Sequence, residues 1–316
     1  PWAGAGGEKR RRATHIAGAD RLDRCFIRPY WTIVVARKSK QRLSRTPRTN
    51  PIVMLRRLLS KFSPPPPEPA RPVGTLPAGT RVYAVGDIHG RLDLLDDLLA
   101  QMEADNASRG DADTTVIFLG DLIDRGPSSA QVVQRLMDLG KGSDRIRFLL
   151  GNHEEVFLKS LQGDPKALPF FVRIGGKPTI LSYGVGEADY CACDYPELLE
   201  MLRARVPSAH VEFLSGFEDM IVLGDYVSVH AGVRPGVPLD QQTPGNLRWI
   251  REEFLNHEIP FEKIVVHGHT ITDDVEERAS RIGIDTGAYA SGRLTAMGFE
   301  GAERWILQTN GLVGRR

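Results

Sequence analysis

The chain has 316 residues, of which 41% are hydrophobic and 26% are charged, and its formal net charge is +1. No stretch approaches the ~20 apolar residues that a membrane-spanning helix needs, and three cysteines cannot form a disulfide framework. These features exclude a transmembrane protein and a disulfide-rich secreted protein, and they predict one or two globular domains in the cytoplasm.

Positive charge gathers near the N-terminus. Residues 1–80 hold 17 Lys and Arg against 4 Asp and Glu, which leaves 24 against 36 in residues 81–316. The first methionine is Met54, and a proline-rich run at residues 64–69 is typical of an extended linker. We interpret residues 1–79 as a basic tail that is disordered or over-extended, with a true start near Met54, and we infer no nucleic-acid partner from it.

Three strand–loop–helix units follow from residue 80 onward. Each begins with an apolar run typical of a buried strand and continues with apolar residues at helical spacing. The strands are predicted at residues 81–85, 115–119 and 145–150, and the helices at residues 92–102, 128–139 and 155–161. Repeated units of this kind favour a parallel, right-handed α/β arrangement.

Residues 163–216 are less regular, because glycines and a proline interrupt the pattern. Helices are predicted only at residues 196–205 and 208–214. We expect this stretch to be an insertion over the carboxyl ends of the strands and to set specificity, as variable surface segments commonly do.

From residue 218 onward the pattern changes to strands. Residues 220–223 and 226–229 are joined by Gly224-Asp225, a hairpin signal. Further strands are predicted at residues 264–266, 281–285, 293–299 and 305–308. We expect these strands to form a second sheet packed on the first. The predicted fold class is therefore α/β, a four-layer α/β/β/α sandwich of two mixed sheets flanked by helices.

Side chains of metal-ligating type follow the strands in glycine-rich loops. They are Asp87, His89, Asp121, Asp124, Asn152, His153, His230 and His269. Singly, each is more often a turn, cap or core residue, but five consecutive loops of this kind predict a metal centre. Oxygen and nitrogen ligands suit Mn, Fe, Zn or Ni, and we expect Asp121 to bridge two such ions.

Three of these loops, at residues 86–90, 120–126 and 151–154, resemble the signature blocks of the calcineurin-like metallophosphoesterases. Within that superfamily they resemble the phosphoprotein phosphatase branch of bacterial and bacteriophage lambda-type enzymes. The loops at residues 230–232 and 268–270 resemble the two later metal blocks. The resemblance implies a catalytic domain over residues 80–316, with two divalent ions, most commonly Mn²⁺, and a metal-bridging water that attacks a phosphoric ester.

The resemblance also implies a role for each site residue. The ligands it implies are Asp87 and His89 for the first metal, Asp121 for both, and Asn152, His230 and His269 for the second. His153 would be the general acid, oriented by Asp124, and Arg125 would bind phosphoryl oxygens. For a second phosphate-binding arginine we expect Arg251, with Arg248 as the alternative.

Two further residues lie beside these loops. In a regular strand His267 would share a face with His269, and we interpret it as a strand residue that is not a ligand. Asp285 follows a predicted strand and is a candidate for bracing the site.

The substrate is less firmly indicated than the chemistry. Asp124 and Glu154 resemble the phosphatase branch, whereas Leu150 and the run at residues 126–129 resemble symmetrical diadenosine-tetraphosphate hydrolases. We expect a serine/threonine protein phosphatase acting on a phosphorylated protein or a small phosphoester, with dinucleoside polyphosphate hydrolysis as the alternative. A metal-stabilised binding module without activity is disfavoured, because it has no need of Asp124, His153 and Arg125.

Overall fold

The computed structural model describes residues 74–310 of the chain. Residues 1–73, and with them the predicted start at Met54, lie outside the described residues. Residues 74–79, which the sequence analysis assigned to the tail, contact the folded part. Leu76 is buried, and its N–H donates to the Gly301 carbonyl at 2.9 Å.

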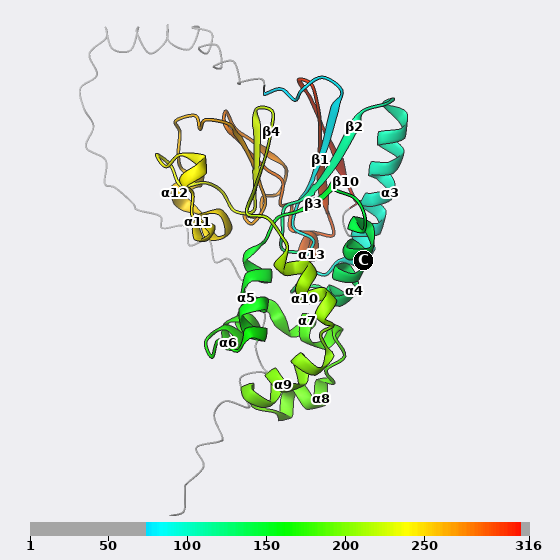
Figure 1. Ribbon diagram of the computed structural model, residues 1–316, viewed down its shortest axis with the longest axis vertical. Helices are drawn as coiled ribbons and strands as arrows, with labels where there is room; N and C mark the ends of the chain where they lie inside the picture. The colour runs from blue at the N-terminus through cyan, green and yellow to red at the C-terminus, as the bar shows by residue number, and fades with distance from the viewer. Residues whose placement is uncertain (1–73, 311–316) are drawn as a thin grey trace, which may run out of the picture. The chain divides into compact units, whose positions relative to one another are not determined.

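Two five-stranded mixed sheets form the centre of the fold, which confirms the predicted class (Figure 1). The first sheet has the order β10-β9-β1-β2-β3. Its strands are β1 (Thr80–Val85), β2 (Asp113–Phe118), β3 (Ile146–Phe148), β9 (Thr295–Glu300) and β10 (Glu303–Gln308). β1, β2 and β3 run parallel, as the three repeated units predict, and β9 and β10 are antiparallel additions.

The second sheet has the order β4-β5-β6-β8-β7. Its strands are β4 (Met220–Leu223), β5 (Tyr226–Val229), β6 (Ile264–His267), β7 (Glu276–Glu277) and β8 (Arg281–Gly283). Gly224, at φ 56°, closes the predicted β4–β5 hairpin in a conformation that favours glycine. The prediction that all C-terminal strands belong to this sheet was wrong, because β9 pairs with β1 in the first sheet.

Helices cover both outer faces and complete the four layers (Figure 1). α3 (Leu92–Ser108) and α4 (Ser129–Gly140) cover the first sheet through side chains such as Leu98 and Val133. The short helices η2 (Leu239–Gln241), α11 (Pro244–Trp249) and α12 (Glu252–Leu255) follow β5, and Leu247 and Phe254 cover the second sheet. Between the sheets lie apolar side chains that include Ile117, and each such buried side chain stabilises the fold by roughly 1.5–3 kcal/mol.

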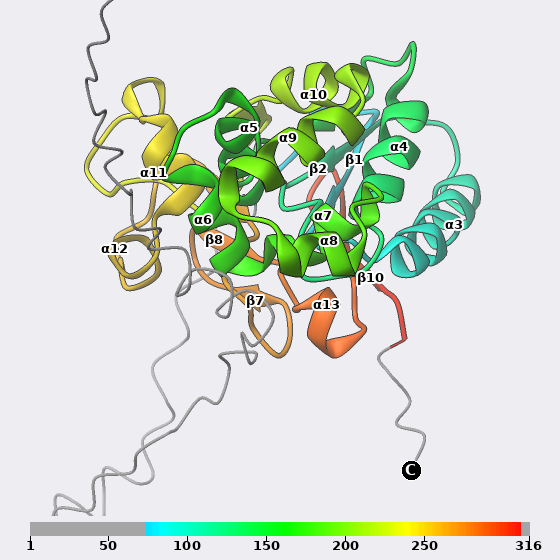
Figure 2. The same cartoon turned by 90° about the horizontal axis from the view of Figure 1, so that it is seen from below.

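Residues 163–216, hereafter the helical segment, lie at the carboxyl ends of the central strands, as Figure 2 shows from below. After α5 (Asn152–Gln162), its elements are α6 (Ala167–Phe171), η1 (Val172–Gly176), α7 (Lys177–Ser182), α8 (Glu187–Ala192), α9 (Tyr195–Arg205) and α10 (Ser208–Ser215). The sequence predicted α9 and α10 but missed α6 to α8. Gly175, at φ 120°, joins α6 to α7 through a π-turn, and Pro178 lies in the first turn of α7, where its missing N–H is tolerated.

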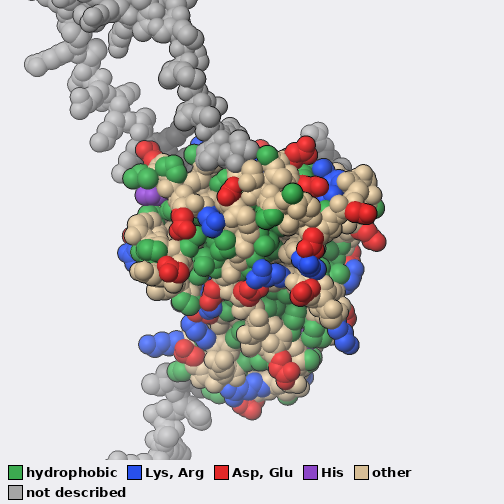
Figure 3. All heavy atoms as spheres, turned by 45° about the horizontal axis from the view of Figure 1, so that its top comes forward, with side chains coloured by type: hydrophobic (Ala, Val, Ile, Leu, Met, Phe, Trp, Pro, Cys, Tyr) green, Lys and Arg blue, Asp and Glu red, His purple; other side chains and the backbone are tan. Residues whose placement is uncertain are grey.

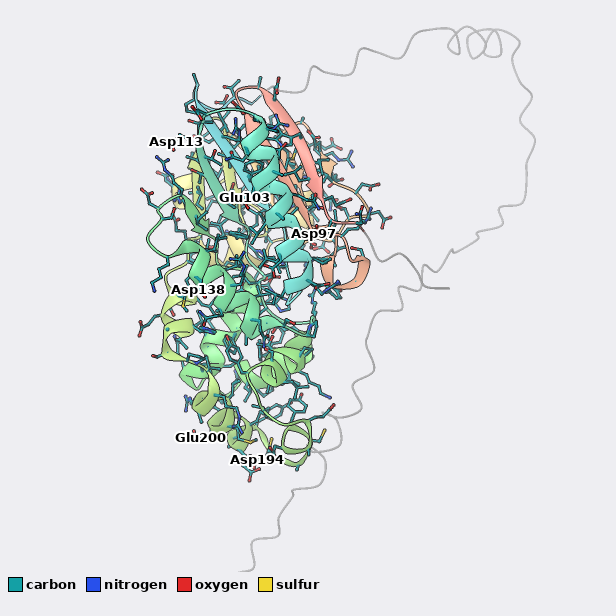
Figure 4. All side chains as sticks on the ribbon, turned by 90° about the vertical axis from the view of Figure 1, so that its right-hand side faces the viewer. Asp97, Glu103, Asp113, Asp138, Asp194 and Glu200 are labelled. Atoms are coloured by element: carbon teal, nitrogen blue, oxygen red, sulfur yellow. The ribbon has the colours of Figure 1, made fainter. Side chains whose placement is uncertain are left out.

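The surface of the described residues is rich in carboxylates, in line with the acidic balance of residues 81–316. Figure 4 labels Asp97 and Glu103 on α3 and Asp138 on α4, and all three are exposed. On the face seen in Figure 3, basic and acidic side chains are intermixed. Within residues 74–310, no helix is both long enough and apolar enough to cross a membrane.

Candidate dinuclear metal centre

The predicted ligands lie in loops at the carboxyl ends of strands from both sheets. All six are at most 7% exposed. His89, Asp121 and His269 adopt the left-handed backbone conformation, with φ of 47°, 50° and 63°. Such conformations are unfavourable for residues other than glycine and cluster at functional sites. The local backbone therefore turns sharply where these side chains enter the site.

Asp121, in the loop after β2, belongs to two groups of donor atoms. The first group contains His89, Asp121 and His153, the second contains Asp121, His230 and His269, and the donor atoms within each lie within 4.8 Å of one another. Asp121 Oδ2 is 3.7 Å from His89 Nε2, and Oδ1 is 3.4 Å from His230 Nε2. One carboxylate thus presents one oxygen to each group.

The protons of two histidines point away from the donor groups. His89 Nδ1 donates to the Ile123 carbonyl and His230 Nδ1 donates to the Leu119 carbonyl, both at 2.8 Å. Because a carbonyl can only accept, each Nε2 carries a lone pair. Burial lowers the pKa of both rings and keeps them neutral.

The Nε2 atoms of His89, His230 and His269 lack a hydrogen-bond donor within the described residues. His89 Nε2 and His269 Nε2 are buried without a hydrogen-bond partner there, and His230 Nε2 faces the Asn152 Oδ1 acceptor at 3.0 Å. Buried acceptors are normally satisfied. Acceptors that converge without donors fit divalent metal ions held by nitrogen and oxygen.

Asp87, a predicted ligand of the first metal, lies beside the two groups. Its carboxylate accepts the His269 N–H, at 3.2 Å for Oδ1 and 3.1 Å for Oδ2. Burial, with the nearby carboxylates of Asp285 and Asp121, raises the pKa of Asp87. Asp285 thus lies near enough to Asp87 to affect its pKa, at the place where a bracing residue was expected from the sequence.

The Asp121 loop is held in place by the carboxylate of Glu154. Oε1 accepts from the backbone N–H groups of Leu122 at 2.8 Å and Ile123 at 3.2 Å, and Oε2 accepts from Asp121 at 2.9 Å and Gly151 at 3.1 Å. Burial and the nearby Asp121 carboxylate raise the pKa of Glu154 to about 8, and the backbone N–H donors oppose this rise because they stabilise the ionised form. From the sequence, Glu154 served only to distinguish family branches. Its position three residues after the helix N-cap was a usable signal.

His153 and Asp124, the predicted acid and its partner, are in direct contact. His153 Nδ1 donates to Asp124 Oδ2 at 2.6 Å, and the Arg125 guanidinium lies 3.1 Å from His153 Nε2. Nε2 accepts from Arg125 when the ring is neutral and carries a proton of its own when the ring is cationic. Burial lowers the pKa of His153, but Asp121 and Asp124 outweigh that effect and raise it above its ordinary value. His153 can therefore hold a proton at Nε2 beside the first donor group.

Asp124 also contacts the helical segment. Thr179 of α7 donates from its hydroxyl to Asp124 Oδ1 at 2.6 Å. The sequence analysis missed Thr179, because nothing in the local sequence marks a threonine 55 residues away from its partner.

The predicted arginines lie on different sides of Asp121. Arg125 is half-buried beside His153, with its guanidinium 4.9 Å from the ring of Tyr289, which α13 (Ala288–Ser291) carries. Arg251 is exposed, donates to the Thr270 hydroxyl at 3.4 Å, and is close enough to contribute to lowering the pKa of His269 in the second group.

The alternative arginine and the excluded histidine lie apart from the centre. Arg248 is paired with Asp219 at 2.6 Å and with Glu155 at 3.5 Å. His267 stacks edge-on against Phe254 at 4.9 Å and is in neither donor group. The left-handed backbone of His269 interrupts the strand alternation that would have placed His267 on the same face.

Comparisons with known proteins agree with this geometry. The family model described as calcineurin-like phosphoesterase matches residues 80–313. The symmetrical bis(5'-nucleosyl)-tetraphosphatase of Acidovorax ebreus (strain TPSY) is 36% identical over 154 residues, which is 49% of this chain and 44% of the relative. The protein of the same name from Bordetella pertussis (strain Tohama I) is 32% identical over 152 residues, 48% of this chain and 43% of the relative.

The chain thus spans about half the length of the curated relatives that it matches. A crystal structure of a protein provisionally described as a diadenosine tetraphosphatase is 24% identical, with a TM-score of 0.52. The match covers 76% of this chain and 100% of that chain, and it shows a shared fold.

Proposed function

The chain belongs to the calcineurin-like phosphoesterase family, and from this premise we propose that its site is a dinuclear metal centre that hydrolyses phosphoric esters or anhydrides. Members of this family use two divalent ions. The observation that carries the proposal is Asp121, which presents one carboxylate oxygen to each of two donor groups. We propose manganese as the metal pair, and iron, zinc or nickel would suit the same oxygen and nitrogen donors.

The proposed division of labour follows the contacts. Two divalent ions, when bound, acidify a water molecule and neutralise charge on phosphoryl oxygens. The residues that would hold them are Asp87, His89, Asp121, Asn152, His230 and His269. Arg125, whose guanidinium matches two phosphoryl oxygens, would orient the phosphoryl group beside His153. His153 would give a proton from Nε2 to the leaving oxygen, while Asp124 holds the opposite ring nitrogen.

For the substrate we propose a dinucleoside tetraphosphate that is cleaved symmetrically at a P–O–P bond. The relatives at 32% and 36% identity carry that activity in their names. Arg125 and Arg251 lie beside different donor groups, and two separated guanidinium groups suit successive phosphates of one chain. This proposal reverses the order of the two substrates expected from the sequence.

The protein phosphatase reading remains the second candidate because of one contact. A nucleoside diphosphate is a good leaving group, since a phosphate has a second pKa of about 6, whereas a serine or threonine alkoxide leaves only with a proton. The 2.6 Å contact between Asp124 and His153 supplies that proton donor. It therefore favours a phosphomonoester of an alcohol.

The test compares the two substrates on the full chain loaded with Mn²⁺. We expect diadenosine tetraphosphate to give ADP as its only nucleotide product, with kcat/KM at least about tenfold above that for a phosphoserine peptide, a difference of about 1.4 kcal/mol. A kcat/KM that is higher for the phosphoserine peptide would make the protein phosphatase activity the preferred proposal. Hydrolysis of neither substrate, nor of p-nitrophenyl phosphate, would contradict the enzyme proposal.

A further inference from the structure

Thr179 binds the same carboxylate that holds the proposed general acid. Asp124 Oδ1 accepts from the Thr179 hydroxyl and Oδ2 accepts from His153 Nδ1, each at 2.6 Å. The three residues form a continuous chain of hydrogen bonds from α7 to the edge of the metal centre. Asp124 and Thr179 are both 0% exposed, so solvent does not supply a replacement donor.

The direction of each hydrogen bond follows from the neighbours. The backbone N–H of Asp124 donates to the hydroxyl oxygens of Thr179 at 2.9 Å and Ser129 at 3.0 Å. Thr179 Oγ1 is also 2.8 Å from Ser129 Oγ. Because the carboxylate can only accept, the Thr179 hydroxyl donates its one proton to Asp124. The Ser129 hydroxyl then donates to Thr179 Oγ1. Every polar atom of this cluster is satisfied in one arrangement.

A second contact joins the helical segment to the same loop. The Arg125 N–H donates to the Gly175 carbonyl at 3.0 Å, and a Cβ at Gly175 would lie 2.9 Å from Arg125 Cγ. Asp124 and Arg125 adopt φ of 73° and 66°. Such backbone conformations persist where surrounding contacts determine them, and the helical segment supplies contacts to both residues.

We infer that Thr179 is a positioning residue for the general acid His153. Its hydroxyl holds the Asp124 carboxylate turned toward His153 Nδ1 and so fixes the ring with Nε2 facing Asp121. The inference rests on the proposed function, with His153 as the proton donor, and extends that function to a residue of the helical segment. It predicts that Thr179 matters most when the leaving oxygen is strongly basic.

The experiment compares two aryl phosphates that differ in the basicity of the leaving group. Phenyl phosphate releases a basic phenolate and depends on the acid, whereas p-nitrophenyl phosphate releases a weak base and depends on it far less. In the full Mn²⁺-loaded chain, Thr179→Val should lower kcat for phenyl phosphate about tenfold or more. For p-nitrophenyl phosphate the expected loss is less than about threefold. Thr179→Ser should restore the wild-type ratio.

Ser182 provides a matched control in the same helix. Its hydroxyl accepts from the Ala130 N–H at 3.1 Å and donates to the backbone carbonyl of Thr179 at 2.7 Å, so it holds the same turn of α7 without a hydrogen bond to Asp124 among the described residues. Ser182→Ala loosens α7 from α4, so it should leave the ratio of the two rates at the wild-type value. If Ser182→Ala shifted the ratio as Thr179→Val does, the effect would be one of helix packing and the inference would be wrong.

The remaining outcomes separate this inference from the proposed function. Equal losses on both substrates in Thr179→Val would contradict the positioning role while leaving the hydrolase intact. A wild-type chain that cleaves neither ester would contradict the proposed function itself. If the valine variant does not fold, Thr179→Ala is judged by the same ratio.

Discussion

The two donor groups that share Asp121 are built from different parts of the fold and are equipped differently. The first group, with His89 and His153, lies at the end of the first sheet, and His153 is tied to Asp124 and Arg125. The second group, with His230 and His269, follows strands of the second sheet. One side thus holds the proposed proton donor His153 with an arginine beside it, and the other holds the imidazoles of His230 and His269.

From this difference we expect metal binding and proton transfer to be separable in this site. The second group contributes lone pairs fixed by backbone carbonyls, as at His230. The first group adds a hydrogen-bonded chain that reaches into the helical segment through Thr179. Substitutions should therefore fall into two classes, those that remove metal and those that lower turnover with metal in place.

The largest effect is expected for Asp121→Asn, because Asp121 is the one residue in both groups. Replacing one carboxylate oxygen by an amide nitrogen removes a donor atom from one group, and it also removes the negative charge that both ions would share. We expect both metals to be lost together and activity to fall to background, since metal-based charge stabilisation supplies several kcal/mol. Metal analysis after dialysis measures this. Retention of one tightly bound ion would argue against a carboxylate that both ions share.

His153→Asn should have the next largest effect, on turnover alone. Removing a general acid lowers kcat by about 10²–10⁴-fold, and the predicted metal ligands are unchanged. The assay pairs kcat with metal content in the same sample. Because His153 Nε2 is only 3.8 Å from Asp121 Oδ2, simultaneous loss of one ion would reassign His153 as a ligand.

Glu154→Gln should weaken metal binding by both donor groups, because Asp121 belongs to both. The amide replaces a carboxylate oxygen that accepts backbone N–H groups of the Asp121 loop, so the loop is held less firmly. Changes of this kind around a metal site cost about 10–100-fold in metal affinity or activity. Manganese titration by calorimetry measures the two affinities. Unchanged affinity at both sites would show that the loop keeps its shape without Glu154.

The smallest effect is expected for Arg251→Ala. Arg251 is exposed, and exposed charge contacts contribute less than about 1 kcal/mol, so hydrolysis of p-nitrophenyl phosphate should fall at most about fivefold. The loss should be greater for diadenosine tetraphosphate, which has further phosphates to bind. Arg248→Ala is the control, because its carboxylate pairs already engage it. Equal losses of activity on both substrates would show that Arg251 does not bind the further phosphates of diadenosine tetraphosphate.

The sequence predicted the parts of the fold that depend on neighbouring residues. Apolar runs identified β1 and β2, and Gly224-Asp225 identified the β4–β5 hairpin. The pairing of β9 with β1 could not be predicted, because it joins residues more than 200 positions apart and leaves no local pattern. The helices α6 to α8 were missed because Gly175 and Pro178 usually end helices, whereas here they join two short ones.

The site, like the fold, has parts that neighbouring residues predict and parts that they do not. Its polar residues stand beside glycine in loops after strands, and this pattern predicted five side chains that the structure places in the two donor groups, namely His89, Asp121, His153, His230 and His269. Thr179 could not be predicted, because its role depends on the position of α7 over Asp124. The place of Asp87 beside the donor groups was equally hidden, since it depends on the His269 N–H and on Asp285, which come from distant segments.

The most direct test of the account is electron paramagnetic resonance of the full chain titrated with Mn²⁺. If Asp121 bridges two ions at roughly 3.5–4 Å, two equivalents should bind and the spectrum should show an exchange-coupled pair, which Asp121→Asn abolishes. A spectrum of isolated Mn²⁺ ions, or saturation at one equivalent, would contradict a shared carboxylate at the centre of this site.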